Sequence, residues 1–230
     1  MRLFFQICLS LMLFSSAVNA QTTMTGEQLS KHITKAGDFL NQQNFAGVIS
    51  TVEPVIASFE VAYPASEKLV YCGEGPAQTL MLLGMAVSQK KDGVVVDQFY
   101  CDAYFMKGFA LIDLNKLSDA GAYLQKASDL APLNAHFMNE YAEWHKTNRH
   151  WQQSYDLFEK AKGIAEFSEE SFRKEIEARS LRGMGFNLIE MGKLDEAEKL
   201  FEQSLKVLPN NSSALSELQY IKEQRAKSGK

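Results

Sequence analysis

The sequence contains few residues that interrupt helices and no excess of positive charge. Its 230 residues include only 5 prolines and 2 tryptophans, which favours long helices over a succession of short strands and turns. The formal net charge is -4, so the chain lacks the basic excess that a phosphate backbone attracts, and we expect no nucleic-acid partner. With 46% hydrophobic and 23% charged residues, the composition is that of an ordinary globular protein.

Recognisable catalytic motifs are also lacking. We find no nucleophile elbow, no glycine-rich loop for phosphate and no zinc-binding helix signature. The spacing of five between His145 and His150 predicts that they lie on different sides of a helix, and His136 lies about two and a half turns before His145. These histidines, like His32, are typical of structural or surface positions. We therefore predict a protein that is not an enzyme and that uses no cofactor or metal.

The N-terminal apolar run is too short for a stable membrane span. It extends from Leu3 to Phe14, follows Arg2, and precedes the small residues that end at Ala20. A span needs about 20 apolar residues, whereas this order of charge, apolar run and small residues is typical of a signal peptide. We expect a signal peptide over residues 1–20 and export of the chain, to the periplasm in the first place, with secretion as the alternative.

Two cysteines, Cys72 and Cys101, follow the predicted signal peptide. An even number of cysteines in an exported chain favours a disulfide. The loop would hold about 30 residues, for which chain entropy gives roughly 3–4 kcal/mol of stabilisation. Two buried free thiols are the alternative, because a simple antiparallel hairpin of 76–90 and 97–115 would leave the cysteines several turns out of step. We predict the disulfide.

The strongest signal in the sequence is an internal repeat. Two stretches share the same order: a large residue, glycine, an apolar residue, a polar turn, alanine, a large apolar residue, a small residue and proline. The first places these types at Tyr104, Gly108, Leu111, Ala120, Leu124, Ala127 and Pro132, and the second at Leu181, Gly185, Leu188, Ala197, Phe201, Ser204 and Pro209. A third copy between them contains Tyr141, Ala142, Ser154, Phe158 and Ala161 and lacks the proline.

The small residues of the repeat have a packing role. We expect Gly108, Ala142 and Gly185 to lie in first helices, where they allow the following helix to approach closely. Ala120 and Ala197 would meet them from the second helices. Proline ends the unit because it cannot continue a helix. Each copy therefore predicts a helix–turn–helix hairpin.

This pattern resembles the tetratricopeptide repeat, whose unit is a helix–turn–helix of about 34 residues. The resemblance implies an all-α fold, an α-solenoid of antiparallel helix hairpins wound into a right-handed superhelix. It places units at 101–134, 135–168 and 178–211, after a degenerate helical region at 21–100 and before a capping helix and tail at 212–230. Residues 166–177 lie between the second and third units, and we expect them to extend the next helix at its N-terminus.

The N-terminal region is less regular. A capping box at Thr25 predicts a helix, and a second helix from Phe45 should be kinked or split at Pro54. Pro64 to Tyr71 is predicted as a short helix. Val94 to Val96 has strand propensity but no evident partner strand, so we expect a loop packed against the helices.

The resemblance also implies a concave groove lined by the first helix of each unit. The expected partner-binding residues are Asp102, Phe105, Phe109, Asn139, Glu143, Arg182 and Phe186. Exposed aromatic residues on such a face favour an interface; the alternative is that they pack against the N-terminal half or the long extended helix, so that the groove is partly filled. Phe105 and Phe109 stand where chaperone-binding members of the family have a lysine and an asparagine that clamp a C-terminal carboxylate. We therefore do not expect that ligand.

The function implied is that of a non-enzymatic scaffold or adaptor of the cell envelope. Its partner would be a protein or peptide segment bound in the groove, and the sequence does not identify it. Two alternatives remain open: a self-associating structural protein of the envelope, and an accessory unit of an envelope enzyme.

Overall fold

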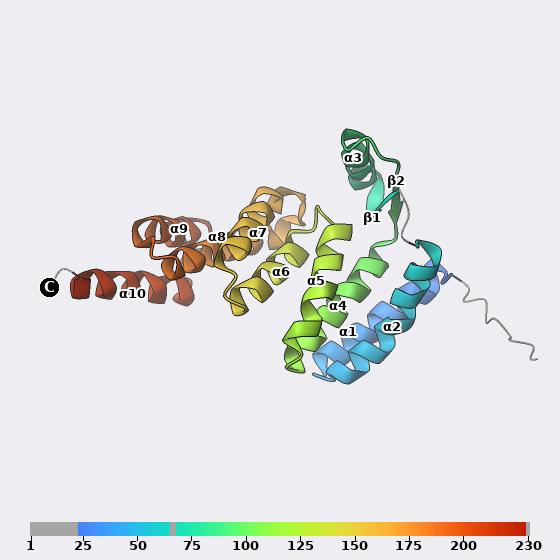
Figure 1. The fold of residues 1–230 in the computed structure, drawn as a ribbon, viewed down its shortest axis with the longest axis horizontal. Helices are drawn as coiled ribbons and strands as arrows, with labels where there is room; N and C mark the ends of the chain where they lie inside the picture. The colour runs from blue at the N-terminus through green and yellow to red at the C-terminus, as the bar shows by residue number, and fades with distance from the viewer. Residues whose placement is uncertain (1–22, 65–67, 229–230) are drawn as a thin grey trace, which may run out of the picture.

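A computed structural model of the chain describes residues 23–64 and 68–228. The predicted signal peptide lies outside the described residues. The described chain forms an elongated row of helices in which consecutive helices pack as hairpins (Figure 1). The helices are α1 (Gly26–Asn41), α2 (Phe45–Ala62), α3 (Gly75–Ser88), α4 (Gln98–Asp113), α5 (Leu117–Leu130), α6 (Ala135–Thr147), α7 (Trp151–Gly163), α8 (Glu170–Glu190), α9 (Leu194–Val207) and α10 (Ser212–Ser228), with a short 3₁₀ turn, η1 (Ala165–Phe167), before α8.

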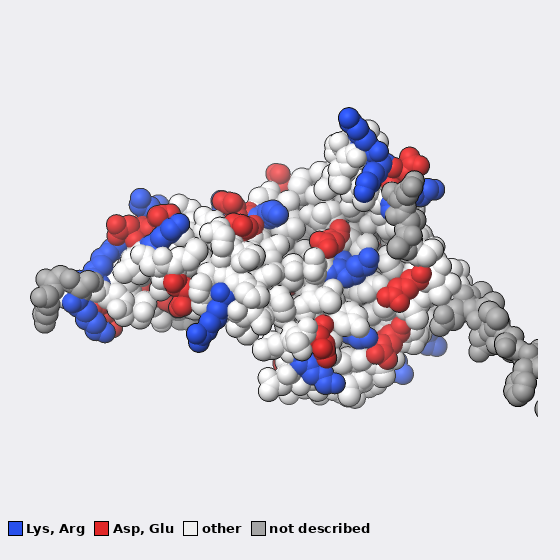
Figure 2. All heavy atoms as spheres, viewed as in Figure 1, with Lys and Arg blue, Asp and Glu red and all other residues white. Residues whose placement is uncertain are grey.

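A small βαβ unit interrupts the row between α2 and α4. Strand β1 (Leu69–Cys72) pairs in parallel with β2 (Gly93–Val96), and α3 makes the crossover between them. The unit stands off the row of helices (Figure 1), and it protrudes at the edge of the face shown in Figure 2. Helix α3 contains no charged residue and leaves Leu80 and Val87 each 74% exposed. The rest of the described chain therefore does not cover its outer side.

Two local predictions are wrong in this unit. Leu69 to Tyr71 belong to a strand rather than to a helix, and Val94 to Val96 form the partner strand rather than a loop. The two strands lie more than twenty residues apart in sequence and meet only because α3 folds back between them, which a local pattern does not reveal. Outside this unit, the prediction of an all-α solenoid of helix hairpins is confirmed.

The small residues of the repeat lie at close helix contacts. A Cβ atom added at Gly108 would be 2.8 Å from Cγ of Leu124, and one added at Gly185 would be 2.8 Å from Cε2 of Phe201. Neither helix pair could keep its present spacing with a larger residue at the glycine. The alanines expected to pack in the same layers, Ala120, Ala142 and Ala197, are fully buried.

Helix α2 is the described helix that is long and apolar enough to cross a membrane by length and composition. It packs against α1 and α4, and its Val48, Val52 and Val55 have no exposed surface. Core packing therefore accounts for its apolar character. Pro54 is exposed and lies within one continuous helix, so the predicted split does not occur. The capping box at Thr25 is present.

The C-terminal end of the row is covered by α10. Its Ala214 and Ile221 are fully buried in one cluster with Phe201 of α9. Arg225 adds ion pairs to Asp195 and Glu198 on α9, at 2.5 and 2.8 Å. Helix α8 is 21 residues long and begins at Glu170, before the third copy of the repeat. The predicted N-terminal extension of this helix is therefore present, although residues 166–169 lie in η1 and the short connection that follows it rather than in α8.

Candidate partner-binding pocket

A disulfide fastens the βαβ unit to the row of helices. It joins Cys72, the last residue of β1, to Cys101 in α4, with an S–S distance of 2.05 Å and a Cα–Cα distance of 6.2 Å. The predicted disulfide is thus present. The two cysteines are not several turns out of step, as a simple antiparallel hairpin would have left them. The parallel strand pair places Cys72 beside Val96, two residues before α4 begins. The residues that follow Cys72 are held against α4 as a result.

Beside the disulfide lies a pocket of about 590 Å³. One wall comes from the βαβ unit and includes Cys72, Glu74 and Gln78. The floor comes from the α5–α6 connection and from α6, with Leu133 and His136 among its residues. The opposite wall is formed by η1 and the N-terminal half of α8. The two elements that fall outside the repeat pattern therefore enclose the pocket between them.

The α8 wall presents aromatic side chains to solvent. Phe167 is 38% exposed and Phe172 is 60% exposed, and Ile176 lies on the same wall. Large exposed apolar residues next to a cavity are typical of binding surfaces. The sequence-based groove residues include neither phenylalanine. The signal that could have identified them is an aromatic pair on either side of the acidic Ser168–Glu170 segment, where a solvated helix start would be polar throughout.

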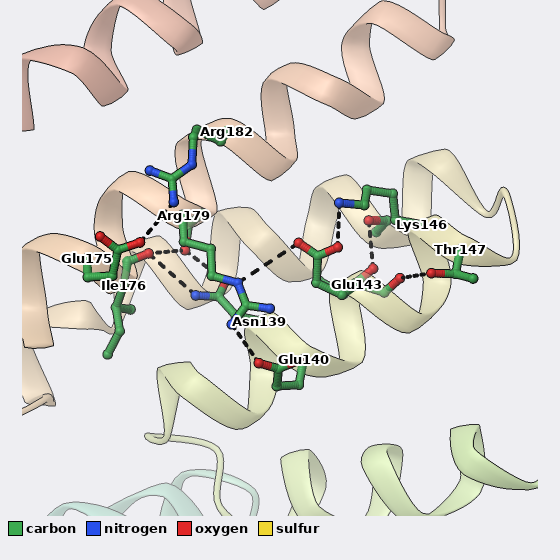
Figure 3. Close-up of polar contacts among 12 residues, drawn as sticks. Asn139, Glu140, Glu143, Lys146, Thr147, Glu175, Ile176, Arg179 and Arg182 are labelled. Atoms are coloured by element: carbon green, nitrogen blue, oxygen red, sulfur yellow. Dashed lines mark hydrogen bonds and ion pairs between the residues drawn. The ribbon is translucent and has the colours of Figure 1, made fainter. Parts of the chain in front are cut away.

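Asn139 is one of the predicted groove residues that lines the pocket. Its side chain is 1% exposed, and its amide is bonded within the protein: Nδ2 donates to the carbonyl of Ile176 at 3.4 Å, and Oδ1 accepts from Oγ of Ser180 at 2.9 Å (Figure 3). These bonds tie α6 to α8. The structure thus places Asn139 as a positioning residue of the pocket floor, with its polar atoms already engaged.

Arg179 is the cation that lines the pocket, and it stands at one of the positions that the family resemblance assigns to the groove. Its Nη1 lies 2.6 Å from Oε1 of Glu140, and its Nε lies 4.0 Å from Oε1 of Glu143 (Figure 3). Glu143, a predicted groove residue, also pairs with Lys146. The ion pairs cross from α8 to α6, so they brace the floor and leave Arg179 largely neutralised by its neighbours.

Arg182 faces its own helix. Its Nη2 lies 2.9 Å from Oε1 of Glu175 (Figure 3), and its Nη1 is buried with no partner in the part of the chain that the structure describes. Unlike Arg179, it is not among the residues that line the pocket.

The three predicted groove phenylalanines pack inside the stack. Phe105 stacks on Phe137 of α6 with ring centroids 4.7 Å apart, and Phe109 lies 6.2 Å from Phe105. Phe186 lies 6.1 Å from Trp151 and beneath the ammonium of Lys146. All three are half-buried. Each of these rings therefore has a neighbour within the helical stack and keeps part of its surface exposed.

Asp102, another predicted groove residue, lies in α4 beside the disulfide's Cys101 and is not among the residues that line the pocket. It accepts a hydrogen bond from Nε2 of Gln98, a pocket residue, at 3.3 Å. Burial raises the pKa of Asp102 to about 6, and repulsion from Glu74 and Asp97 contributes in the same direction. This side of the pocket is consequently rich in carboxylates.

Two of the histidines lie close together at the α6–α7 turn. Nδ1 of His145 lies 3.2 Å from Nδ1 of His150 across the α6–α7 turn, so the prediction that they point to different sides is wrong. The turn at Asn148 and Arg149 ends α6 and brings His150 back. Within residues 23–64 and 68–228, no group of three or more histidine, cysteine or acidic residues could hold a metal ion.

Comparisons with known proteins agree with the repeat pattern. Residues 102–132 match the tetratricopeptide repeat family model. The structure is similar to PilF of Pseudomonas aeruginosa, with 16% identity over 87% of this chain and 70% of that chain and a TM-score of 0.58. It is also similar to MamA from Desulfovibrio magneticus, with 10% identity over 88% of each chain and a TM-score of 0.58.

A third structural relative contains a bound peptide. The first tetratricopeptide domain of Spaghetti (RPAP3), solved with the HSP90 peptide SRMEEVD, is 22% identical over 57% of this chain and 97% of that chain, with a TM-score of 0.50. No curated protein sequence matches significantly. At these identities the structural likeness establishes the fold.

Proposed function

We propose that this tetratricopeptide-repeat protein is a non-enzymatic scaffold that binds a segment of a partner protein in the pocket between the βαβ unit and α8. The observation that carries the proposal is the pocket itself, about 590 Å³ in volume, with Phe167 and Phe172 exposed on its wall. Pockets that bind ligands typically measure about 300–1,000 Å³ and combine apolar walls with a few polar groups. Repeat stacks present such surfaces to extended segments of other proteins.

The polar groups of the pocket suit a peptide backbone. Gln78 and Gln98 on one wall and Asn134 on the floor carry side-chain amides. One atom of each amide is bonded within the protein: Oε1 of Gln78 accepts from the backbone N–H of Glu74, Nε2 of Gln98 donates to Asp102, and Oδ1 of Asn134 accepts from the backbone N–H of Phe137. The other amide atom of each, Nε2 of Gln78, Oε1 of Gln98 and Nδ2 of Asn134, can serve a peptide backbone. The peptide bound to the RPAP3 relative supports the same class of ligand.

We also propose that the protein works in the cell envelope, in the periplasm. The N-terminal order of Arg2, an apolar run and small residues up to Ala20 supports export. The Cys72–Cys101 disulfide supports an oxidising compartment, because such bonds persist there and are rare in the cytosol. A fusion of the first twenty residues to a reporter that is active only after export tests this part separately.

The pocket can be tested by site-specific photocrosslinking in the native envelope. A photoreactive residue at Phe172 reports on the pocket, and one at Tyr220, 43% exposed on α10, is the matched control. We expect a discrete protein adduct from position 172 that is missing from position 220, and mass spectrometry then identifies the partner. Crosslinks from position 220 alone, or the same adducts from both positions, would contradict the proposal.

A substitution gives the quantitative test once the partner is purified. Phe172→Ser removes an exposed aromatic ring and should leave the melting temperature nearly unchanged. It should weaken the partner at least about tenfold in titration calorimetry, since aromatic residues at the centre of an interface often contribute the most to binding.

A further inference from the structure

The carboxylates that line the pocket outnumber its cations. Glu74, Glu169 and Glu175 are lining residues, and Arg179 is the lining cation. Arg179 already contacts Glu140 at 2.6 Å, so its charge is used within the protein. The pocket is therefore negative overall.

Two of these carboxylates are uncompensated. Glu175 pairs with Arg182, but in the described ranges neither Glu74 nor Glu169 takes part in an ion pair. Glu74 follows β1 on the βαβ wall, and Glu169 precedes α8 on the opposite wall. Both are exposed. A cationic group in the pocket would thus have an available carboxylate on either side.

Asp102 strengthens the negative character of the βαβ wall. It is half-buried, its nearby charges are the like-signed Glu74 and Asp97, and its hydrogen-bond donor is the neutral Gln98. A cation bound close to these groups would relieve their mutual repulsion.

The apolar wall suits the remainder of a basic segment. Lysine and arginine have long apolar stems, which can lie along exposed rings while the charged end reaches a carboxylate. Phe167 and Phe172 also offer ring faces to a cation. An apolar neighbour in the ligand would cover Ile176 and Leu133, which line the same pocket.

From this charge complementarity we infer that the pocket binds a segment of a partner protein in which a lysine or arginine stands next to apolar residues. The inference rests on the proposed function and specifies the ligand chemistry at the same site. An acidic segment such as SRMEEVD, bound by the RPAP3 relative, would instead meet charge of its own sign.

A random-peptide display library selected on the purified chain tests the inference without knowledge of the partner. Peptides that bind the wild-type chain better than the Phe172→Ser variant are recovered, synthesised with a fluorophore and titrated by anisotropy. Two double variants follow: Glu74→Gln with Glu169→Gln in the pocket, and Glu159→Gln with Glu202→Gln as the control. The control removes the same charge from exposed positions outside this pocket.

We expect the recovered peptides to be enriched in lysine or arginine beside apolar residues. The pocket double variant should weaken them about three- to tenfold, since partly exposed charge pairs each contribute modestly, and the control should have no such effect. Affinity should fall as sodium chloride rises from about 0.05 to about 0.5 M.

The failures are distinguishable. Peptides that depend on Phe172 but lack basic residues, or that bind the pocket double variant equally well, would overturn the inference and leave the proposed function standing. Failure to recover any peptide that depends on Phe172 would count against the proposed function itself. Self-association in light scattering that the pocket double variant abolishes would assign the pocket to a second copy of the chain, and would overturn the inference of a different partner.

Discussion

Removing the Cys72–Cys101 disulfide should loosen one wall of the pocket while the helical stack persists. The bond spans a sequence separation of 29 residues, for which the chain-entropy relation gives about 3.5 kcal/mol at 25 °C. Alanine is the suitable replacement at both positions, because each cysteine is buried and a serine hydroxyl would need a hydrogen-bond partner.

The loss should be concentrated in the βαβ unit. Tyr71, Leu82 and Ala86 of this unit form a small core with Leu133 at the pocket floor. The strands of the unit also join the large cluster of α1, α2 and α4 residues, through Cys72 and Val96. We therefore expect α3 and the small core to open locally before the remainder unfolds. The stack retains its own layers, because each hairpin of a repeat protein depends mainly on its neighbours.

Limited proteolysis measures this local opening. Lys90 and Lys91 are exposed in the turn between α3 and β2, and we expect trypsin to cut there faster in the double alanine variant than in the oxidised wild type. Circular dichroism should show nearly the same helix content in both. Binding of a peptide recovered by display should weaken, because Glu74 and Gln78 are no longer held against α4.

Reduction of the wild type is the internal control. It should reproduce the faster cleavage, and the alanine variant should not respond to the reductant. Equal cleavage rates and equal peptide affinities in the variant and the oxidised wild type would refute the reasoning that the disulfide positions this wall.

Three further outcomes follow from the packing and the charges. Gly185→Ala places a methyl group 2.8 Å from the buried Phe201 ring and should lower the free energy of unfolding in urea by about 1–2 kcal/mol. The control Gly84→Ala, in α3, meets nothing within 4 Å and should raise the free energy of unfolding by about 0.5–1 kcal/mol. Loss of stability in both variants would refute the packing argument. Phe105→Ala should cost about 3 kcal/mol because the ring stacks on Phe137 in the core, and an unchanged melting temperature would show that the ring is dispensable to the stack. The pKa of Asp102 is raised from 3.8 to about 6, so the folded chain holds this proton more tightly and its stability falls as the pH rises through that window. Asp102→Asn should therefore match the wild type near pH 4 and exceed it by about 2–3 kcal/mol near pH 8 in urea unfolding, and equal pH profiles would contradict the raised pKa.

The helix hairpins could be predicted because their signals are local. Gly108 and Gly185 recur at the same offset from the large residues of the next helix, Leu124 and Phe201, and in the structure each glycine lies against that residue. The βαβ unit could not be predicted in this way. Val94 to Val96 resemble a strand, but their partner begins at Leu69, and the helix between them reads as one more member of the stack.

The candidate site was located only in part for a related reason. Family positions marked Phe105 and Phe186 as groove residues, yet each meets an aromatic neighbour, Phe137 and Trp151, that fills the space. Asn139, predicted as a partner-binding residue, lines the pocket, but its amide is bonded to Ile176 and Ser180 of α8. Arg179 is held toward α6 by Glu140, a contact across 39 residues.

A regular stack of hairpins offers a concave surface that is open along its length, so it has little means of enclosing a ligand. Here two departures from regularity supply the missing walls: the βαβ unit, fastened by a disulfide, and the extended start of α8, which carries Phe172. Specific recognition requires an enclosed, partly apolar space with placed charges, and Glu74 and Glu169 provide those charges on opposite walls. Under the proposed function, the repeat stabilises the chain and the two irregular segments select its ligand. Exchanging either segment for a plain repeat connection should leave a folded stack and remove the preference for basic peptides.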